Sequence, residues 1–169
     1  MACPPATSPK KSRPPKPVIG WRELVDLPEL GLIGEIAKID TGARTSSLHV
    51  DRIEPFTGAD GSQRAIISVV RRRPGEPRRT LRWDLEIREF RNVRSSNGAV
   101  EELAVILTTL EIGGKVVKRE FTLTNRKKMS HDILIGRKGI GRLFTVDPAR
   151  TFLLGKVPET ANGSENTQS

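Results

Sequence analysis

The sequence contains one cysteine, Cys3, two histidines, His49 and His131, and no tyrosine among its 169 residues. One cysteine forms no internal disulfide and cannot supply a Cys-rich zinc site. No apolar run approaches the roughly 20 residues that a membrane-spanning helix needs, and the chain does not open with the pattern of a signal peptide. We therefore expect a reduced, soluble, cytoplasmic protein without a membrane partner.

Both ends of the chain are poor in apolar residues. Residues 1–17 contain six prolines and four Lys or Arg, and residues 158–169 are polar. Such segments bury too little apolar surface to offset their ordering entropy, so we expect both to be disordered. The segment between them, residues 18–157, is then the folded domain. The whole chain has a formal charge of +9. Four basic residues in the first arm and two glutamates in the last leave +7 on the domain.

The domain reads as a series of short strands. Apolar or alternating segments are expected as strands at 34–40, 47–56, 65–72, 80–89, 103–112, 116–124 and 131–135, with a helical turn within 137–143. Asp60-Gly61 and Gly113-Gly114 are typical hairpin turns. Because no long segment has the 3.6-residue period of a helix, the pattern predicts an all-β barrel or sandwich.

One short motif indicates chemistry. An apolar strand runs into Asp40, followed by Thr41-Gly42-Ala43, which is how aspartic peptidases present a catalytic carboxylate. Gly42 lets the backbone approach closely, and Thr41 can form a hydrogen bond to a second copy of the loop. Two such carboxylates share one proton, so one acts as base toward water and the other polarises the scissile carbonyl. The sequence contains one Asp-Thr-Gly, and a paired site would need two chains, which predicts a homodimer.

A second stretch supports this interpretation. Ile133-Leu134-Ile135-Gly136-Arg137 follows Asp40 by about 90 residues. Retroviral-type proteases have a comparable apolar-apolar-Gly-Arg stretch, which packs behind the Asp loop before a short helix. The order and spacing of the two stretches agree with a retropepsin-like barrel.

The resemblance extends over residues 19–155. The matching stretches are Ile19-Gly20-Trp21-Arg22-Glu23, Lys38 to His49, Arg94-Ser95-Ser96-Asn97-Gly98, Leu123-Thr124-Asn125-Arg126, Ile135-Gly136-Arg137 and Val146-Asp147-Pro148. Together they resemble the RimK-associated or "ATP-dependent zinc protease" family, which is grouped with retropepsin-like aspartic endopeptidases. The resemblance implies an acid-protease-like closed barrel with a short C-terminal helix. It also implies a hydrolase linked to ATP-grasp ligases that add glutamates to protein or peptide tails.

The family name mentions zinc and ATP, but the sequence lacks the common motifs that bind either one. The chain has no His-Glu-x-x-His, and residues 136–142 fit neither nucleotide-binding fingerprint. His49 and His131 read as hydrogen-bonded or surface residues rather than ligands. We expect no metal site and no cofactor, and any ATP dependence would belong to a partner ligase.

The candidate site divides into catalytic and substrate-binding residues. The catalytic set is Asp40, Thr41 and Gly42, and the substrate-binding set is Arg44, Ser46, Asn97, Arg126 and Arg137. Arg44 either lowers the pKa of Asp40 or holds a substrate carboxylate, or else forms a surface ion pair. Arg137 has the alternative of bracing the fold through a carboxylate such as Asp26 or Asp132.

Three functions follow from these observations. The leading one is a peptidase acting through Asp40 on acidic or glutamate-rich tails, which a basic domain would attract. The alternative is a non-catalytic protease-like module that binds acidic peptides or regulates an ATP-grasp ligase. Nucleic-acid binding, suggested by the net charge and the arginines of residues 71–79, is disfavoured because aromatic residues make up 4% of the chain.

Overall fold

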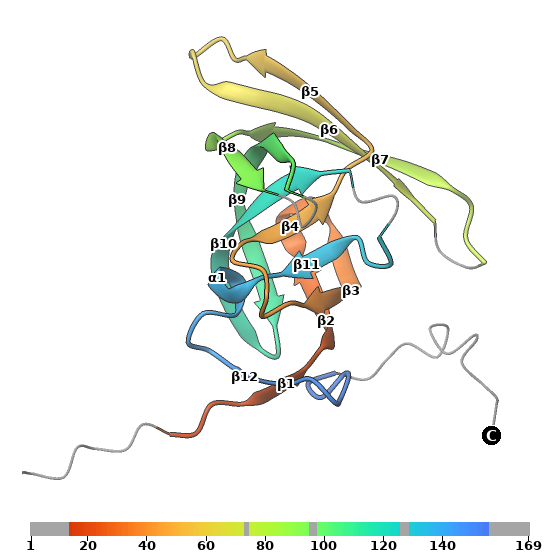
Figure 1. The fold of residues 1–169 in the computed structure, drawn as a ribbon. Coiled ribbons are helices and arrows are strands. Elements are labelled where there is room, and N and C mark those ends of the chain that lie inside the picture. Colours follow the sequence, from red (N-terminus) through yellow and green to blue (C-terminus); the bar gives the residue numbers. More distant parts are fainter. Residues whose placement is uncertain (1–13, 73–74, 95–97, 126–128, 156–169) are drawn as a thin grey trace, which may run out of the picture.

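The computed structural model describes residues 14–72, 75–94, 98–125 and 129–155 (Figure 1). Asn97, Arg126 and most of the two terminal arms lie outside these ranges, so their expected roles and disorder remain predictions. Within the described part of the chain, no helix has the length and apolar character that crossing a membrane requires. The strands are β1 (Val18–Gly20), β2 (Arg22–Leu27), β3 (Leu32–Ile39), β4 (Ser46–His49), β5 (Arg52–Thr57), β6 (Gln63–Arg71), β7 (Arg79–Glu86), β8 (Glu89–Arg94), β9 (Val100–Ile112), β10 (Lys115–Thr124), β11 (Ile133–Ile135) and β12 (Thr145–Asp147). The helices are a 3-10 turn, η1 (Pro28–Leu30), and α1 (Arg137–Ile140).

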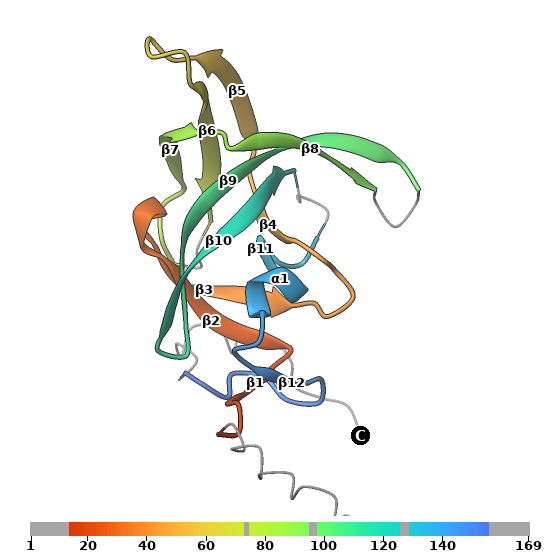
Figure 2. The same ribbon diagram turned by 90° about the vertical axis from the view of Figure 1, so that its left-hand side faces the viewer.

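Six strands close into a barrel. Neighbouring strands follow the order β10-β4-β11-β3-β2-β9, and pairing of β9 with β10 completes the ring. β8 extends the sheet beyond β9, and the β8–β9 ribbon curves away from the barrel (Figure 2). This confirms the expected all-β closed barrel, and α1 is the short helix expected near its C-terminal end.

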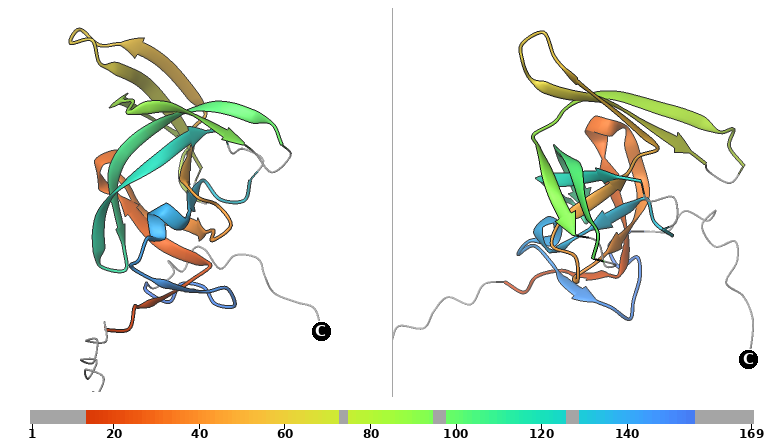
Figure 3. Two further views of the ribbon diagram at one scale, coloured as in Figure 1. Left: turned by 60° about the vertical axis from the view of Figure 1, so that its left-hand side comes forward. Right: turned by 45° about the horizontal axis from the view of Figure 1, so that its top comes forward.

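A second sheet, in the order β5-β6-β7, lies against one end of the barrel (Figure 3). The expected hairpins at Asp60-Gly61 and Gly113-Gly114 are confirmed, joining β5 to β6 and β9 to β10. Both glycines of the second turn have positive φ, a conformation that glycine adopts without a steric penalty. β6 and β7, on either side of the basic stretch, pair antiparallel with Arg71 opposite Arg79.

The prediction of one continuous strand over 47–56 was wrong. β4 ends at His49 in the barrel, and β5 begins at Arg52 in the second sheet. Asp51 directs this change, since its carboxylate accepts the N–H of Val70 at 2.6 Å and its own N–H donates to Ser68 at 2.8 Å. The sequence did not reveal this change of sheet, because apolar residues continue on both sides of the bend.

The strands β1, β2, β8 and β12 were not expected from the sequence. In β2 the inward-facing residues are Glu23, Val25 and Leu27. A glutamate on the buried face breaks the apolar alternation by which a strand is recognised. Glu23 is 1% exposed and accepts hydrogen bonds from the N–H groups of Gly20 at 2.7 Å and Leu153 at 2.9 Å. It thus ties the N-terminal segment to the C-terminal one, beside the parallel β1–β12 pair.

The hydrophobic core fills the barrel and continues under the second sheet. Phe121 and Leu123 of β10 and Ile135 of β11 are fully buried inside the barrel. Ile67 of β6 is also fully buried and belongs to the same cluster, so the second sheet packs onto the barrel core. Full burial of such a side chain is worth about 1.5–3 kcal/mol. This core fixes the barrel frame from which the loop after β3 projects.

Candidate functional site

Asp40 follows the last residue of β3 and begins a tight loop. Its carboxylate oxygen Oδ1 accepts the N–H of Gly42 at 3.0 Å and the N–H of Ala43 at 3.2 Å. A Cβ at position 42 would lie 3.1 Å from this oxygen, so the loop closes most easily around a glycine. The Asp40 side chain is 25% exposed. The loop therefore holds one face of the carboxylate and leaves it accessible to solvent.

Lys38 is the charged partner of Asp40, at 3.2 Å between Nζ and Oδ2. Burial of the Asp40 carboxyl raises its pKa, but the hydrogen bond and charge of Lys38 and the N–H groups of the loop outweigh burial. The net result is an Asp40 pKa below its ordinary value. Lowering this pKa was one of the alternatives considered for Arg44, which lies exposed further along the loop and is not among the groups that shift the Asp40 pKa. The available signal was the strand period, which places residues 38 and 40 on one face.

β11 and α1 brace the loop from behind. β11 lies between β3, to which it is parallel, and β4, to which it is antiparallel. The Asp40 N–H donates to the carbonyl of Ile135 at 2.9 Å, and the Arg137 N–H donates to the carbonyl of Ala43 at 2.9 Å. These bonds confirm that the Ile133–Ile135 stretch packs behind the Asp loop before a short helix.

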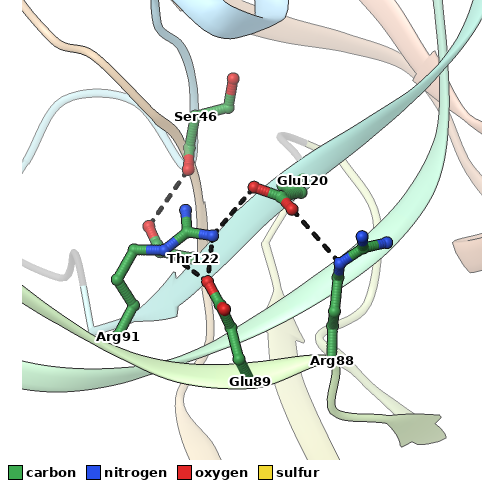
Figure 4. A network of polar contacts seen from close by, with 6 residues as sticks. All are labelled: Ser46, Arg88, Glu89, Arg91, Glu120 and Thr122. Carbon is green, nitrogen blue, oxygen red and sulfur yellow. Dashed lines mark hydrogen bonds and ion pairs between the residues drawn. The ribbon is translucent and has the colours of Figure 1, made fainter.

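Gly136 and Ser46 make this packing close. A Cβ at position 136 would lie 2.7 Å from the carbonyl carbon of Thr45, which leaves room only for glycine. Ser46 is 1% exposed, and its hydroxyl accepts the Gly136 N–H at 3.2 Å. The Ser46 carbonyl accepts the Thr122 hydroxyl at 3.1 Å (Figure 4). The structure thus places Ser46, expected at the substrate, within the brace behind the loop.

Arg137 braces the same loop from its outer side. Its Nη1 donates to the carbonyl of Thr41 at 2.8 Å and to that of Gly42 at 3.0 Å. Of the two suggested carboxylate partners, Asp26 instead accepts the Gly34 N–H at 2.6 Å through its side chain. The hydrogen bonds of the Arg137 guanidinium run to the two loop carbonyls and not to Asp132. Arg137 therefore holds backbone carbonyls of the Asp loop, a role that no linear motif predicts.

The two histidines have local partners. His49 is buried, with Nε2 at 3.6 Å from Asp51, and His131 has Nδ1 at 2.8 Å from the Ser130 hydroxyl and its ring edge-on to Trp21. In the residues that the structure describes, no group of three or more His, Cys, Asp or Glu side chains is arranged to hold a metal ion.

A cleft of about 240 Å³ lies beside the loop. Its lining comes from the end of the Asp loop just before β4, from β9, from β10 and from α1, and consists of Thr45, Leu107, Lys118, Arg119, Glu120 and Lys138. Three of these six residues are basic and one is acidic. Sequence reasoning missed this cleft because its walls come from four separate segments.

Comparison with known proteins places this site in a family. The chain is 34% identical over 152 residues to a Shewanella halifaxensis protein named "Probable alpha-L-glutamate ligase", covering 82% of this chain and 30% of that protein. A Desulfotalea psychrophila protein of the same name is 33% identical over 153 residues, covering 90% of this chain and 32% of that protein. The chain thus spans about 30% of the length of these curated relatives.

A crystal structure and a family model complete the comparison. A Legionella pneumophila protein of unknown function superposes with a TM-score of 0.67 at 27% identity, covering 82% of this chain and 98% of that one. The family model described as "Retropepsin-like aspartic endopeptidase RimB" matches residues 18–157. With the Asp loop and its brace on the same barrel, the chain belongs to the RimB-like family of retropepsin-like aspartic endopeptidases.

Proposed function

We propose that this protein is a peptidase that cleaves acidic, glutamate-rich peptide tails through Asp40. The observation that carries the proposal is the geometry of Asp40. Two backbone N–H groups hold its carboxylate at a strand end, and the side chain stays 25% exposed. A lowered pKa keeps it ionised as a base toward water. Gly42 closes the loop, and Thr41 is exposed, so we assign its hydroxyl to a hydrogen bond with a second copy of the loop.

The reaction needs a second carboxyl group, which we assign to Asp40 of a second copy. The ionised Asp40 accepts a proton from water, whose oxygen adds to the scissile carbonyl carbon. The protonated Asp40 of the other copy donates its proton to the carbonyl oxygen. Collapse of the tetrahedral intermediate breaks the C–N bond, and a proton passes to the departing amine. Two carboxylates side by side raise one of the two pKa values, which opposes the effect of Lys38.

The charge of the domain and its relatives' names support the choice of substrate. Residues 18–157 carry a net charge of +7, which concentrates acidic peptides near the surface. The relatives are named "Probable alpha-L-glutamate ligase". We propose that this chain acts with an ATP-grasp ligase of that kind and removes residues from tails of the type such a ligase builds. Arg44, Arg126 and Asn97 are the proposed contacts to substrate.

The test is the Asp40→Asn variant, assayed on an oligo-glutamate peptide by mass spectrometry of the products. We expect cleavage to be abolished while thermal unfolding stays close to wild type. Asp60→Asn is the matched control, because Asp60 also accepts the N–H of a residue two positions on, at 3.0 Å, in an exposed turn. It should cleave normally. Cleavage that survives in Asp40→Asn contradicts the aspartic mechanism. We also propose that no resident metal takes part, so a chelator should leave cleavage unchanged.

One observation favours a second candidate, a non-catalytic module that binds acidic tails or regulates a ligase. Within one chain Asp40 forms an ion pair with Lys38, at 3.2 Å. Such an ion-paired carboxylate fits a residue that binds a ligand as well as it fits a catalytic base. This function predicts that oligo-glutamate binds without turnover, and that turnover is absent at every protein concentration. Detected peptide products with wild type but not with Asp40→Asn would exclude it.

A further inference from the structure

The cleft beside the Asp loop carries more positive charge than its own acidic residue offsets. Lys118 and Arg119 come from β10, Lys138 comes from α1, and Thr45 leads from the loop into β4. We propose that this cleft binds side-chain carboxylates of the acidic peptide. These carboxylates belong to peptide residues away from the bond that Asp40 cleaves. The inference rests on the proposed function in taking an acidic peptide as the ligand.

Arg119 is positioned to recognise an anion. Its Nε donates to the carbonyl of Gly139 at 3.1 Å, and its Nη1 donates to the carbonyl of Lys118 at 2.9 Å. Two fixed bonds orient the guanidinium, whose five N–H donors exceed what these two bonds use. A pre-oriented guanidinium loses little conformational entropy on binding and pairs well with a planar carboxylate.

Glu120, the acidic residue of the cleft, forms ion pairs with two arginines that do not line the cleft. Glu120 lies 3.0 Å from Arg91 Nη2 and 3.4 Å from Arg88 Nε (Figure 4). The Arg91 hydrogen bond holds the Glu120 pKa below its ordinary value, and the charge of Lys138 acts in the same direction. Since the Glu120 carboxylate is shared with two arginines outside the lining, it offsets only part of the combined charge of Arg119 and Lys138. Lys118 is paired with Glu29. The positive charge available to a ligand therefore belongs mainly to Arg119 and Lys138.

The other walls suit a glutamate side chain better than a nucleotide. Leu107 is 45% exposed in the lining and offers an apolar surface to the two methylene groups of a glutamate. The lining contains no aromatic ring on which a base could stack. A volume of about 240 Å³ accommodates one or two side chains. An acidic peptide is thus the favoured ligand, and a nucleic acid becomes an outcome of the test.

The experiment measures binding in the Asp40→Asn protein, so that cleavage does not interfere. A fluorescently labelled oligo-glutamate peptide is titrated by anisotropy against Asp40→Asn alone and with Arg119→Gln or Lys138→Gln added. We expect each added change to weaken binding about tenfold, as for loss of one charge-assisted hydrogen bond. Lys115→Gln, an exposed lysine at the start of β10 outside the lining, is the matched control and should change binding less than about twofold.

Three results would overturn the proposal. The first is binding that Arg119→Gln and Lys138→Gln leave unchanged in a folded protein. The second is an equal loss in Lys115→Gln, which would assign binding to general surface charge. The third is a single-stranded DNA of equal charge that displaces the peptide at the same concentration, which would make the cleft a general polyanion site. If Arg119→Gln does not fold, Lys138→Gln carries the test, because its side chain has an exposed position on α1.

The same variants separate this inference from the proposed function. Selective loss of peptide binding in Lys138→Gln supports the cleft even if no variant, nor wild type, ever cleaves the peptide. Conversely, if wild type cleaves the peptide and Lys138→Gln on the otherwise native chain has the same KM, the cleft proposal is wrong and the peptidase stands. A raised KM in Lys138→Gln, with Lys115→Gln unchanged, supports both.

Discussion

Two opposing effects determine the charge of Asp40. Burial favours its protonated form, while the cation of Lys38 and two backbone N–H groups favour the carboxylate. The carboxylate form wins in the single chain, and its pKa lies below the ordinary value. Asp40 is therefore available as a base at neutral pH, and among the groups that lower its pKa the largest effect comes from Lys38.

We predict that Lys38→Gln raises the pKa of Asp40. Without the Lys38 cation, burial still raises the Asp40 pKa, and only the two N–H groups of the loop remain to lower it. Because the carboxylate is the active base, the acidic limb of kcat/KM should move to higher pH. A pH–rate profile measures this shift, and NMR titration of the Asp40 carboxyl carbon measures it independently of activity.

Arg44→Gln is the control for that prediction, since Arg44 is an exposed cation of the same loop. It should leave the titration of Asp40 where it is in the wild type. An equal shift in Arg44→Gln, or none in Lys38→Gln, would contradict the assignment of Lys38 as the group that holds the Asp40 charge.

At the level of elements, the site depends on a strand of three residues. β11 fits between β3 and β4, and the chain then turns at Gly136 against the backbone of Thr45. The local apolar pattern predicted this stretch as a strand, and the resemblance to retroviral-type proteases implied its position behind the Asp loop. The sequence did not predict that Arg137 reaches back to the carbonyls of Thr41 and Gly42.

We predict that Gly136→Ala destabilises the protein by about 1–3 kcal/mol, the usual cost of inserting a methyl group into a filled space. The added Cβ would meet the carbonyl carbon of Thr45 at 2.7 Å, so the Asp loop must shift and cleavage should fall as well. Urea unfolding measures the free energy of unfolding, and the peptide assay measures cleavage.

Gly155→Ala is the matched control, because its Cβ would meet Leu24 at 3.5 Å, an ordinary contact. Its free energy of unfolding should stay within about 0.5 kcal/mol of wild type. A Gly136→Ala variant as stable and active as Gly155→Ala would show that the brace tolerates more movement than the packing suggests.

On the scale of the whole molecule, one barrel presents one Asp40. The proposed pair of carboxylates then requires a second barrel related by a twofold axis. The outer sheet β5-β6-β7 packs on the barrel through the shared core, while the Asp loop projects between β3 and β4. The net charge of +7 on residues 18–157 is spread over both parts. In the cleft beside the loop, three basic side chains lie together.

We predict that subunit mixing reveals the pairing of Asp40. If wild type and Asp40→Asn chains are refolded together in equal amounts, only dimers with two intact Asp40 residues are active. Total cleavage should then fall to about a quarter of that of the same total amount of wild type. A site complete within one chain would retain about half. The assay should be repeated over a range of protein concentrations, since activity per chain should rise as dimers form.

The sequence by itself determined the family, the all-β character, the hairpins and the position of Asp40 at a strand end. The last three depend on short-range patterns, namely apolar alternation, glycine-containing turns and a motif within a few residues, whereas the family depends on several such stretches taken together over residues 19–155. Tertiary structure alone decided the break between β4 and β5, the burial of Ser46, the bonds of Arg137 and the walls of the cleft. The partners in each case come from segments far apart in the chain. Which of them meet depends on strand pairing and barrel closure, and residue type at one position does not encode that.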